Sequence, residues 1–480
     1  MSKKINNPFT LLKLSQATSV CFDKENALCD GELVIKKVVI LDVSKNESEV
    51  SQIISNVLNA VNERSPLIDA LKKQYDFELS TEVRKTYPFD YQIRSMGATF
   101  RGGKSYFIGL VDSMPIKNKL GILKRCDEYF KYGQDVYVLG QGENESVDNL
   151  DTVALIVTKE HIRESMVESI KWLNEQNINV KVVSNDTIVK TSCLAYDSGV
   201  KDTTKQISME YPVIRNAEKY VVFADADREA KNAILKSLKS KGEKVVYIND
   251  DFDNLPGAFE EGKRLVYNIH RICLFLISKI LLAALLITFF IICFATKVFD
   301  NPFALYRYFV LDAIIDIAAI LLLIFDKKRN EVKGKFITNA LKKSLPCALM
   351  MFIASILAIV LYLMQKNNVI NFGIYNSQVA TAINTITLTV LGVLVFYNIC
   401  SPLNRYRRIS IIALGLISIA MLITSAIISY ATNKADPLFG IPFMEMSGPA
   451  YLITAIIIVV LTALYFVINK IFGKDEEYEN

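Results

Sequence analysis

Six long apolar stretches in the second half of the chain constrain its fold more than any other feature. Each is close to the ~20 residues that a helix needs to cross a bilayer, where the backbone must be hydrogen-bonded internally. Before residue 264, charged residues interrupt every apolar run, which indicates a soluble body. The six stretches are 265–294, 303–325, 345–364, 379–400, 409–430 and 451–472. The sequence therefore predicts an all-α membrane domain of six transmembrane helices over 264–473, in contact with lipid.

Basic residues predict the orientation of these helices. They gather in the loop 326–344 and at Arg405, Arg407 and Arg408, whereas the other three loops hold one lysine each. The positive-inside rule places the two basic loops in the cytoplasm. We therefore expect a multi-pass protein of the plasma (cell) membrane with both termini, the soluble part and an acidic tail at 474–480 in the cytoplasm. The polar, basic N-terminus predicts no cleavable signal peptide.

Composition excludes several other classes. The 55 basic residues nearly balance the 50 acidic ones, which argues against a nucleic-acid binder. Eight cysteines in 480 residues, with no CxxC, support neither a disulfide scaffold nor a zinc site.

The soluble part alternates short apolar runs with amphipathic ones. Strands are predicted over 18–22, 152–157, 180–183, 220–223 and 245–248, and helices over 163–176 and 227–240. This alternation is typical of a parallel, doubly wound α/β sheet. Such sheets carry their chemistry at the carboxyl ends of strands, which here hold Asp23, Asp186, Asp225 and Asp250. Carboxylates there suit Mg²⁺ and a phosphoryl group, but Asp also favours caps and turns, so both interpretations stay open.

The order of these segments resembles the catalytic half of P-type (E1-E2) cation-transporting ATPases, above all a bacterial subgroup. VCFDKENALCDGEL resembles a strand followed by DKTGTLT, with Asp23 as the phosphorylated aspartate and Lys24 after it. KVVSND resembles the strand that ends in TGD at Asp186, and Lys231 matches the phosphate-site lysine. The resemblance implies a haloacid dehalogenase-like Rossmannoid domain (1–50 and 151–263) with catalytic residues Asp23, Lys24, Asp186 and Lys231.

An insert at 51–150 resembles a reduced α+β nucleotide-binding domain. Within it PFDYQIRSMGATF resembles the family's nucleotide-binding stretch, with Phe89 and Arg94 at its aromatic and basic positions. GLVD resembles GAPE at Gly109, and EHIR (160–163) resembles the DxxR element at Arg163. These four residues are the nucleotide-binding set that the resemblance implies, with ATP and Mg²⁺ as cofactors.

The same comparison of motifs predicts an impaired catalytic site. Glu25, Asn26 and Ala27 stand where the family has its phosphate-binding threonines and glycine. INDDFDN matches the TGDGVND hinge only loosely, so the implied metal set is Asp23, Asp250 and Asn254, with a neutral amide in place of a carboxylate.

Two carboxylates in the second apolar stretch predict a site for a transported ion. Asp312 and Asp316 are four residues apart and share a helix face. The family draws cation ligands from this helix. The alternative is a pair without function that is protonated or paired with Lys279 of the first stretch.

Three functions remain open. The first is a truncated, catalytically impaired P-type ATPase-like protein, without the actuator domain and first four spans, which has decayed or works with a separately encoded front half. The second is a non-catalytic regulatory or structural pseudo-ATPase. The third is a membrane-anchored haloacid dehalogenase-like phosphatase that uses Asp23.

Overall fold

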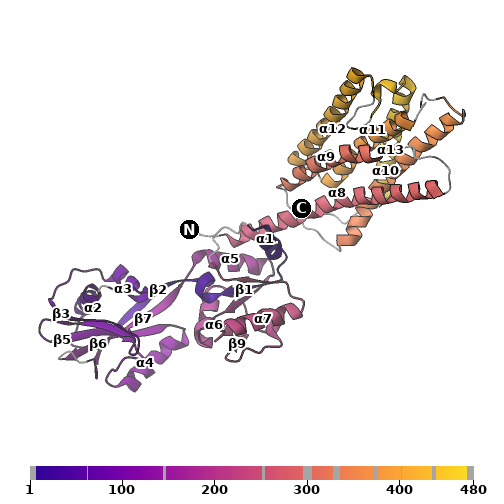
Figure 1. Cartoon of the computed structure of the whole chain (residues 1–480). Helices are drawn as coiled ribbons and strands as arrows, with labels where there is room; N and C mark the ends of the chain where they lie inside the picture. The colour runs from indigo at the N-terminus through magenta and orange to yellow at the C-terminus, as the bar shows by residue number, and fades with distance from the viewer. Residues whose placement is uncertain are drawn as a thin grey trace. The chain divides into compact units, whose positions relative to one another are not determined.

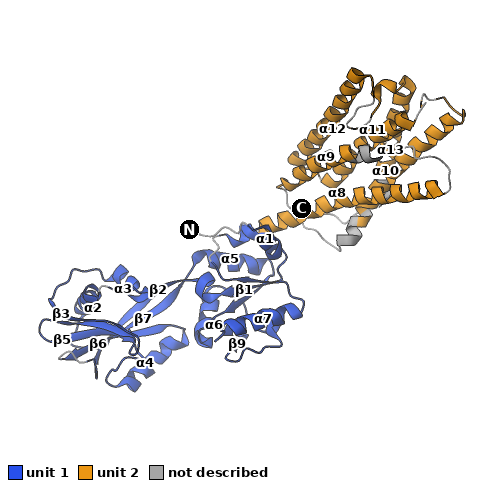
Figure 2. Ribbon diagram, in the orientation of Figure 1, with its two compact units in different colours: residues 1–259 blue, residues 260–480 orange. Residues whose placement is uncertain are grey.

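The computed structural model divides the chain into two compact units, unit 1 (1–259) and unit 2 (260–480) (Figure 2). It describes residues 7–472 except 62, 144–146, 251–253, 296–304, 328–335, 372–373, 375–376, 402, 435–438 and 440. The predicted change from a soluble to a membrane body near residue 264 falls close to the division between the units. The predicted acidic tail and much of the basic loop after the second apolar stretch lie outside the described residues.

Unit 1 contains a five-stranded parallel sheet in the order β11-β1-β8-β10-β9 (Figure 1). Its strands are β1 (Ser19–Asp23), β8 (Asn179–Val183), β9 (Gln206–Ser208), β10 (Val222–Ala224) and β11 (Val245–Ile248). The helices around it are α1 (Pro8–Ser15), α5 (Glu164–Glu175), α6 (Ile188–Asp197) and α7 (Arg228–Ser240). The predicted doubly wound α/β fold is confirmed.

Apolar side chains cover both faces of this sheet, as its uninterrupted apolar strands require. On one face Phe22 packs with Met166 and Leu173 of α5. On the other face Cys21 packs with Ile234 of α7. Because side chains alternate along a strand, Asp23 lies on the same face as Cys21, toward α7.

The rest of unit 1 is a six-stranded antiparallel sheet in the order β2-β7-β6-β5-β4-β3. Helices α2 and α3 cover one face and α4 covers the other (Figure 1). The strands are β2 (Cys29–Ile40), β3 (Val83–Asp90), β4 (Ser95–Phe100), β5 (Lys104–Leu110), β6 (Asp135–Glu143) and β7 (Asp151–Ile162). The helices are α2 (Glu47–Val61), α3 (Pro66–Gln74) and α4 (Lys119–Lys131).

The prediction that 152–157 belongs to the parallel sheet is wrong. This run lies in β7, which pairs antiparallel with β2 and β6. An apolar run buried on both faces fits either kind of sheet, so its partners decide its place. The antiparallel sheet takes in β2 and β7, both of which lie outside the predicted insert bounds of 51–150.

Unit 2 is helical, and five of its described helices are long and apolar enough to cross a membrane. These are α8 (Leu255–Ala295), α10 (Phe336–Lys366), α11 (Ser377–Cys400), α12 (Arg405–Thr432) and α13 (Gly448–Phe472). Between α8 and α10 lies α9 (Leu305–Ile324), which matches the second predicted span but is not among the five. Most of α11 is buried among the other helices, whereas α12 is largely exposed.

A buried ion cluster joins several of these helices. Asp326, which follows α9, accepts hydrogen bonds from Arg271 of α8 at 2.5 Å and from Arg407 of α12 at 2.6 Å. Arg271 also donates to the carbonyl of Ile399 in α11 at 3.1 Å. All three charged side chains are at most 2% exposed. Because an unpaired charge is costly in such a place, this cluster fixes how the four segments meet.

Candidate functional site

The carboxylate of Asp23 lies at the carboxyl end of β1, the strand between β11 and β8, and Asp23 is only 4% exposed. Its Oδ2 atom accepts a hydrogen bond from Lys231 Nζ at 2.8 Å and another from the Tyr247 hydroxyl. Its Oδ1 atom accepts the backbone N–H of Glu25 at 3.1 Å. The structure therefore brings together Asp23 and Lys231, as predicted, and adds a tyrosine to them.

Tyr247 meets Asp23 because of strand register. In the β1–β11 pair Cys21 lies opposite Tyr247, and Asp23 follows Cys21 on the same face. Burial, followed by the hydrogen bond to Asp23, raises the pKa of Tyr247, so the phenol keeps its proton and acts as a donor. One feature of the sequence indicates this contact: Tyr247 carries a polar hydroxyl group within the otherwise apolar strand 245–248.

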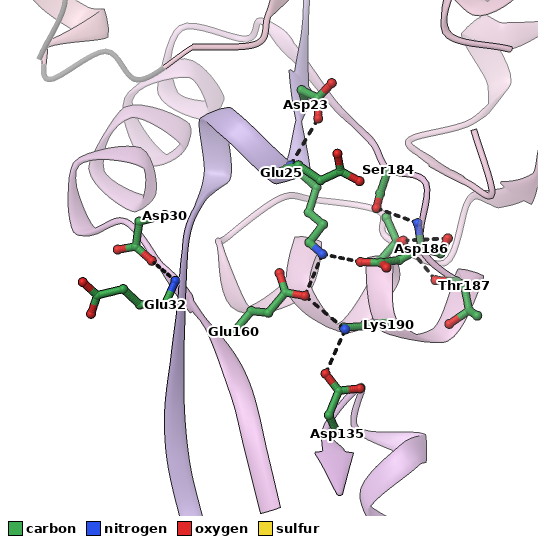
Figure 3. A network of polar contacts seen from close by, with 12 residues as sticks. Asp23, Glu25, Asp30, Glu32, Asp135, Glu160, Ser184, Asp186, Thr187 and Lys190 are labelled. Carbon is green, nitrogen blue, oxygen red and sulfur yellow. Dashed lines mark hydrogen bonds and ion pairs between the residues drawn. The ribbon is translucent and has the colours of Figure 1, made fainter. Parts of the chain in front are cut away.

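Lys24 turns away from Asp23 and enters a separate ionic cluster, which we call the Lys24 clamp (Lys24, Glu160, Asp186, Lys190 and Asp135). The Nζ atom of Lys24 binds Glu160 at 2.7 Å and also binds Asp186. The Nζ atom of Lys190 lies 3.0 Å from Glu160 and 2.9 Å from Asp135, so it links these two carboxylates (Figure 3). Burial lowers the pKa of Lys24, but its hydrogen bonds to Asp186 and Glu160 outweigh burial, and the net pKa is raised.

The Lys24 clamp joins the two sheets of unit 1. Lys24, Asp186 and Lys190 belong to segments of the parallel sheet and its helices, whereas Asp135 and Glu160 lie in β6 and β7 of the antiparallel sheet. The side chains of Lys24 and Glu160 are 6% and 14% exposed, so water screens their attraction little. No pattern in the sequence indicates Asp135 and Lys190, because their contact arises only when α6 packs beside β6.

A cavity of about 440 Å³ lies beside the clamp and extends along the antiparallel sheet. Three members of the predicted nucleotide-binding set line it: Phe89, Arg94 and Gly109. Lys24 and Glu25 line it as well, so the predicted nucleotide residues and the loop after Asp23 share one cavity. Arg94 adopts a left-handed backbone (φ 45°), which lets the chain turn sharply between β3 and β4.

Two of these predicted residues have structural partners that explain them without a ligand. A Cβ at Gly109 would lie 2.4 Å from Ser95 Cβ and 2.7 Å from the carbonyl of Arg94, so the close approach of β4 and β5 requires glycine there. Arg163, the fourth predicted residue, donates from Nε to the carbonyl of Cys29 at 3.3 Å, and it does not line the cavity.

The predicted metal set fits a divalent cation poorly. Asp23 already accepts three hydrogen bonds. Asn254 Oδ1 accepts the N–H of Gly257 at 2.7 Å and so caps the start of α8. Asp250 is exposed just after β11. Within the described part of the chain, no group of three or more His, Cys, Asp or Glu side chains could hold a metal ion.

The predicted ion site in unit 2 is already paired with a cation from the chain itself. Lys279 Nζ of α8 binds Asp312 of α9, and it lies 3.5 Å from Asp316 Oδ1. The side chains of Lys279 and Asp312 are 8% and 9% exposed. The alternative in which Lys279 neutralises the carboxylates therefore has a geometric basis.

The parallel sheet with Asp23 at the end of β1 and Lys231 beside it matches a known family. The model of haloacid dehalogenase-like hydrolases matches residues 18–262, which is half of the chain. The chain belongs to the haloacid dehalogenase-like hydrolase family. As in other doubly wound sheets, the family's chemistry is expected at the strand ends where Asp23 lies.

Relatives extend the likeness of this haloacid dehalogenase-like chain into unit 2. It is 20% identical over 461 residues to "Probable cation-transporting ATPase exp7" of Streptococcus pneumoniae, which covers 85% of this chain and 57% of that protein. It is 21% identical over 318 residues to "Calcium-transporting ATPase CtpE" of Mycobacterium bovis, which covers 57% of this chain and 40% of that protein. The resemblance to P-type cation-transporting ATPases is confirmed. The chain spans about half the length of these relatives.

Proposed function

We propose that this chain is a P-type ATPase-like membrane protein in which phosphorylation of Asp23 is impaired. The contacts of the Asp23 carboxylate carry this proposal. Attack on a phosphoryl group needs a carboxylate oxygen that is free to form the new bond, yet both oxygens are engaged: Oδ2 accepts from Lys231 and Tyr247, and Oδ1 accepts the N–H of Glu25. A lysine beside the nucleophile suits phosphoryl transfer, because it offsets negative charge. The tyrosine adds a second donor and steric cover.

The residues after Asp23 support the same conclusion. Lys24 is bound to Glu160 and Asp186 and is not directed at Asp23. Glu25 is exposed beside Asp23 and adds a negative charge where a dianionic phosphoryl group would have to lie. Of the predicted metal ligands, Asp23 already accepts three hydrogen bonds and Asn254 caps α8, so the set fits Mg²⁺ poorly. The chain is thus proposed to keep the fold of the catalytic domain with little of its turnover.

Phosphorylation of the full chain tests this proposal. The purified protein in detergent is incubated with γ-labelled ATP and Mg²⁺, next to the Asp23→Asn variant and an active P-type ATPase. We expect no label above that of Asp23→Asn, while the active pump is labelled. An acid-stable, alkali-labile label that disappears in Asp23→Asn would show that the site is active. The same preparation with p-nitrophenyl phosphate tests the phosphatase alternative.

The names of the relatives refer to cation transport. For this chain we propose that Asp312 and Asp316 bind the transported cation. With Lys279 bound, the three charged side chains sum to a single negative charge, which favours a monovalent cation or a proton over a divalent one. A separately encoded front half also stays a proposal. Affinity purification of the tagged chain from its native membrane would reveal such a partner.

A further inference from the structure

Positive charge gathers in unit 2 where α9 ends and α12 begins. The sequence of α12 opens with three arginines among its first four residues, and its first turn has no acidic residue. Arg407 is buried against Asp326. Arg405 and Arg408 are exposed, and so is Lys327, which follows Asp326. Within the described part of the chain no ion pair engages these three exposed side chains.

Contacts between α9 and α12 hold these cations close together. The two helices lie side by side (Figure 1). The Tyr406 hydroxyl donates to the carbonyl of Leu322 at 2.9 Å, and Arg407 Nε donates to Asp326 at 2.6 Å. Both contacts join the first turn of α12 to the end of α9. Because Lys327 directly follows Asp326 in the chain, it lies near that turn as well.

The charge of this surface stays strongly positive after its ion pairs are counted. Asp326 shares its carboxylate between Arg271 and Arg407. With the three exposed cations, five basic side chains accompany one acidic side chain, and their formal charges of five plus and one minus sum to +4. The start of a helix also carries partial positive charge, which disfavours arginines there and favours an anion. An anionic ligand would therefore stabilise this arrangement.

The positive-inside rule alone does not account for where these arginines lie. That rule concerns the number of basic residues in a loop, and it is satisfied wherever in the loop they stand. Here Arg405 and Arg408 occupy the first turn of α12, where the helix dipole opposes them. Their position, in contrast to their number, indicates a ligand with negative charge.

Exposed apolar side chains continue from the arginines along α12. Ile409, Ile412 and Leu416 are exposed at intervals of three and four residues, so they form one stripe that begins beside Arg408. Phe325, just beyond the end of α9, is exposed as well. A free phosphate has no part that would use this apolar surface. An anionic phospholipid has both a charged phosphate and hydrocarbon chains, and it is abundant where α12 crosses the bilayer.

We propose that the start of α12 and the end of α9 form a binding site for an anionic phospholipid of the surrounding bilayer. The headgroup phosphate accepts hydrogen bonds from Arg405, Arg408 and Lys327, because guanidinium and ammonium groups bind phosphate strongly. The acyl chains lie along the apolar stripe of α12. The lipid thus joins α9 and α12 at this end of the helices. The proposal goes beyond the proposed function, since it holds whether or not Asp23 is phosphorylated.

Native mass spectrometry of the full chain tests this proposal. The protein in detergent is mixed with equimolar phosphatidylglycerol and phosphatidylcholine, and the lipid that stays bound is identified and counted. We expect phosphatidylglycerol to be retained on the order of tenfold more than phosphatidylcholine. Arg405→Gln/Arg408→Gln should abolish most of this preference, because each basic residue near an anionic headgroup strengthens binding about fivefold.

Two further variants show whether charge and place both matter. Arg405→Lys/Arg408→Lys keeps both charges and should retain most of the preference. The matched control Lys366→Gln/Lys434→Gln removes two exposed lysines beyond or at the far ends of α12 and α10, and it should leave the preference unchanged. Gel filtration of each variant checks that it is folded, as expected for exposed positions.

Equal retention of the two lipids by the unmodified chain would overturn the proposal. So would a control variant that loses as much preference as Arg405→Gln/Arg408→Gln does, because the charges would then act without regard to place. Displacement of the bound lipid by millimolar glycerol phosphate, which has the phosphate without the acyl chains, would show a site for free phosphate and would also overturn it. None of these results bears on labelling of Asp23, so the proposed function is rejected or kept separately.

Discussion

At the scale of single residues, Gly109 shows how a motif position can have a packing role. The resemblance assigns it to the nucleotide site, and it does line the cavity. Yet its missing side chain faces Ser95 and Met114, which lie 2.4 and 2.9 Å from where a Cβ would be. The glycine is therefore required by the β4–β5 contact, whatever the cavity binds.

Replacing Gly109 with alanine should loosen the antiparallel sheet. Overpacking of a tight contact costs about 1–3 kcal/mol, so the amides of β4 and β5 should exchange hydrogen on the order of tenfold faster. Hydrogen exchange of the full chain, read by mass spectrometry, measures this. Gly415→Ala in α12, where a Cβ meets nothing within 4 Å, is the control and should leave exchange unchanged. Equal exchange in both variants would contradict the packing role.

Residues near Asp23 differ in how far the sequence could predict them. The resemblance identifies Lys231 by the helix that carries it and Asp186 by the strand before it. Local patterns along the chain are therefore enough to predict both residues. Tyr247 and Lys190 reach the site through strand register and helix packing, which no local pattern fixes. The resemblance also implies that Lys24 is a catalytic residue, whereas in the structure two carboxylates of other segments bind it.

At the scale of elements, periodicity located most strands and helices but not the sheet to which each strand belongs. The parallel strands 180–183 and 245–248 and the helix 227–240 match β8, β11 and α7 closely. The run 152–157 is a strand too, but it pairs with β2 and β6 and therefore belongs to the antiparallel sheet. Local composition does not indicate which strands pair when they lie more than a hundred residues apart, as β2 and β7 do.

The Lys24 clamp should stabilise unit 1 in a pH-dependent way. Lys24→Met leaves Glu160 and Asp186 without their shared cation, and we expect a loss of about 3 kcal/mol at neutral pH. The pKa of Lys24 is raised in the folded protein, so its contribution is complete below the unfolded value of about 10.4 and is lost as pH rises through the folded pKa. The difference from the unmodified chain should therefore shrink at alkaline pH.

Urea unfolding followed by fluorescence measures this difference, because the single tryptophan, Trp172, packs against Phe259 in the core of unit 1. Lys73→Met is the matched control, since Lys73 and Glu32 are 67% and 58% exposed and such pairs contribute ~1 kcal/mol or less. A Lys24→Met effect that is the same at pH 8 and pH 11.5 would contradict the assignment.

At the scale of the whole molecule, the open question is whether α9 crosses the membrane. The sequence of α9 carries three charged residues, Arg307, Asp312 and Asp316. Lys279 of α8 pairs with both of these aspartates, and Asp326 beyond the end of α9 pairs with Arg271 and Arg407. Paired charges cost much less in a bilayer than free ones, so we predict that α9 spans.

The side on which Lys327 lies decides this prediction. If α8 and α9 both cross, a cysteine at Lys327 faces the same side as one at Lys36 in unit 1; if α9 does not cross, the two lie on opposite sides. Both lysines are exposed, so single Lys36→Cys and Lys327→Cys variants should react with an impermeant maleimide, each measured against the unmodified chain. In intact cells we expect neither to react until the membrane is permeabilised, because the positive-inside rule places both in the cytoplasm. Lys366→Cys, at the far end of α10, is the control and should react without permeabilisation. Reaction of Lys327→Cys in intact cells, with Lys36→Cys protected, would show that α9 does not span and that five helices cross.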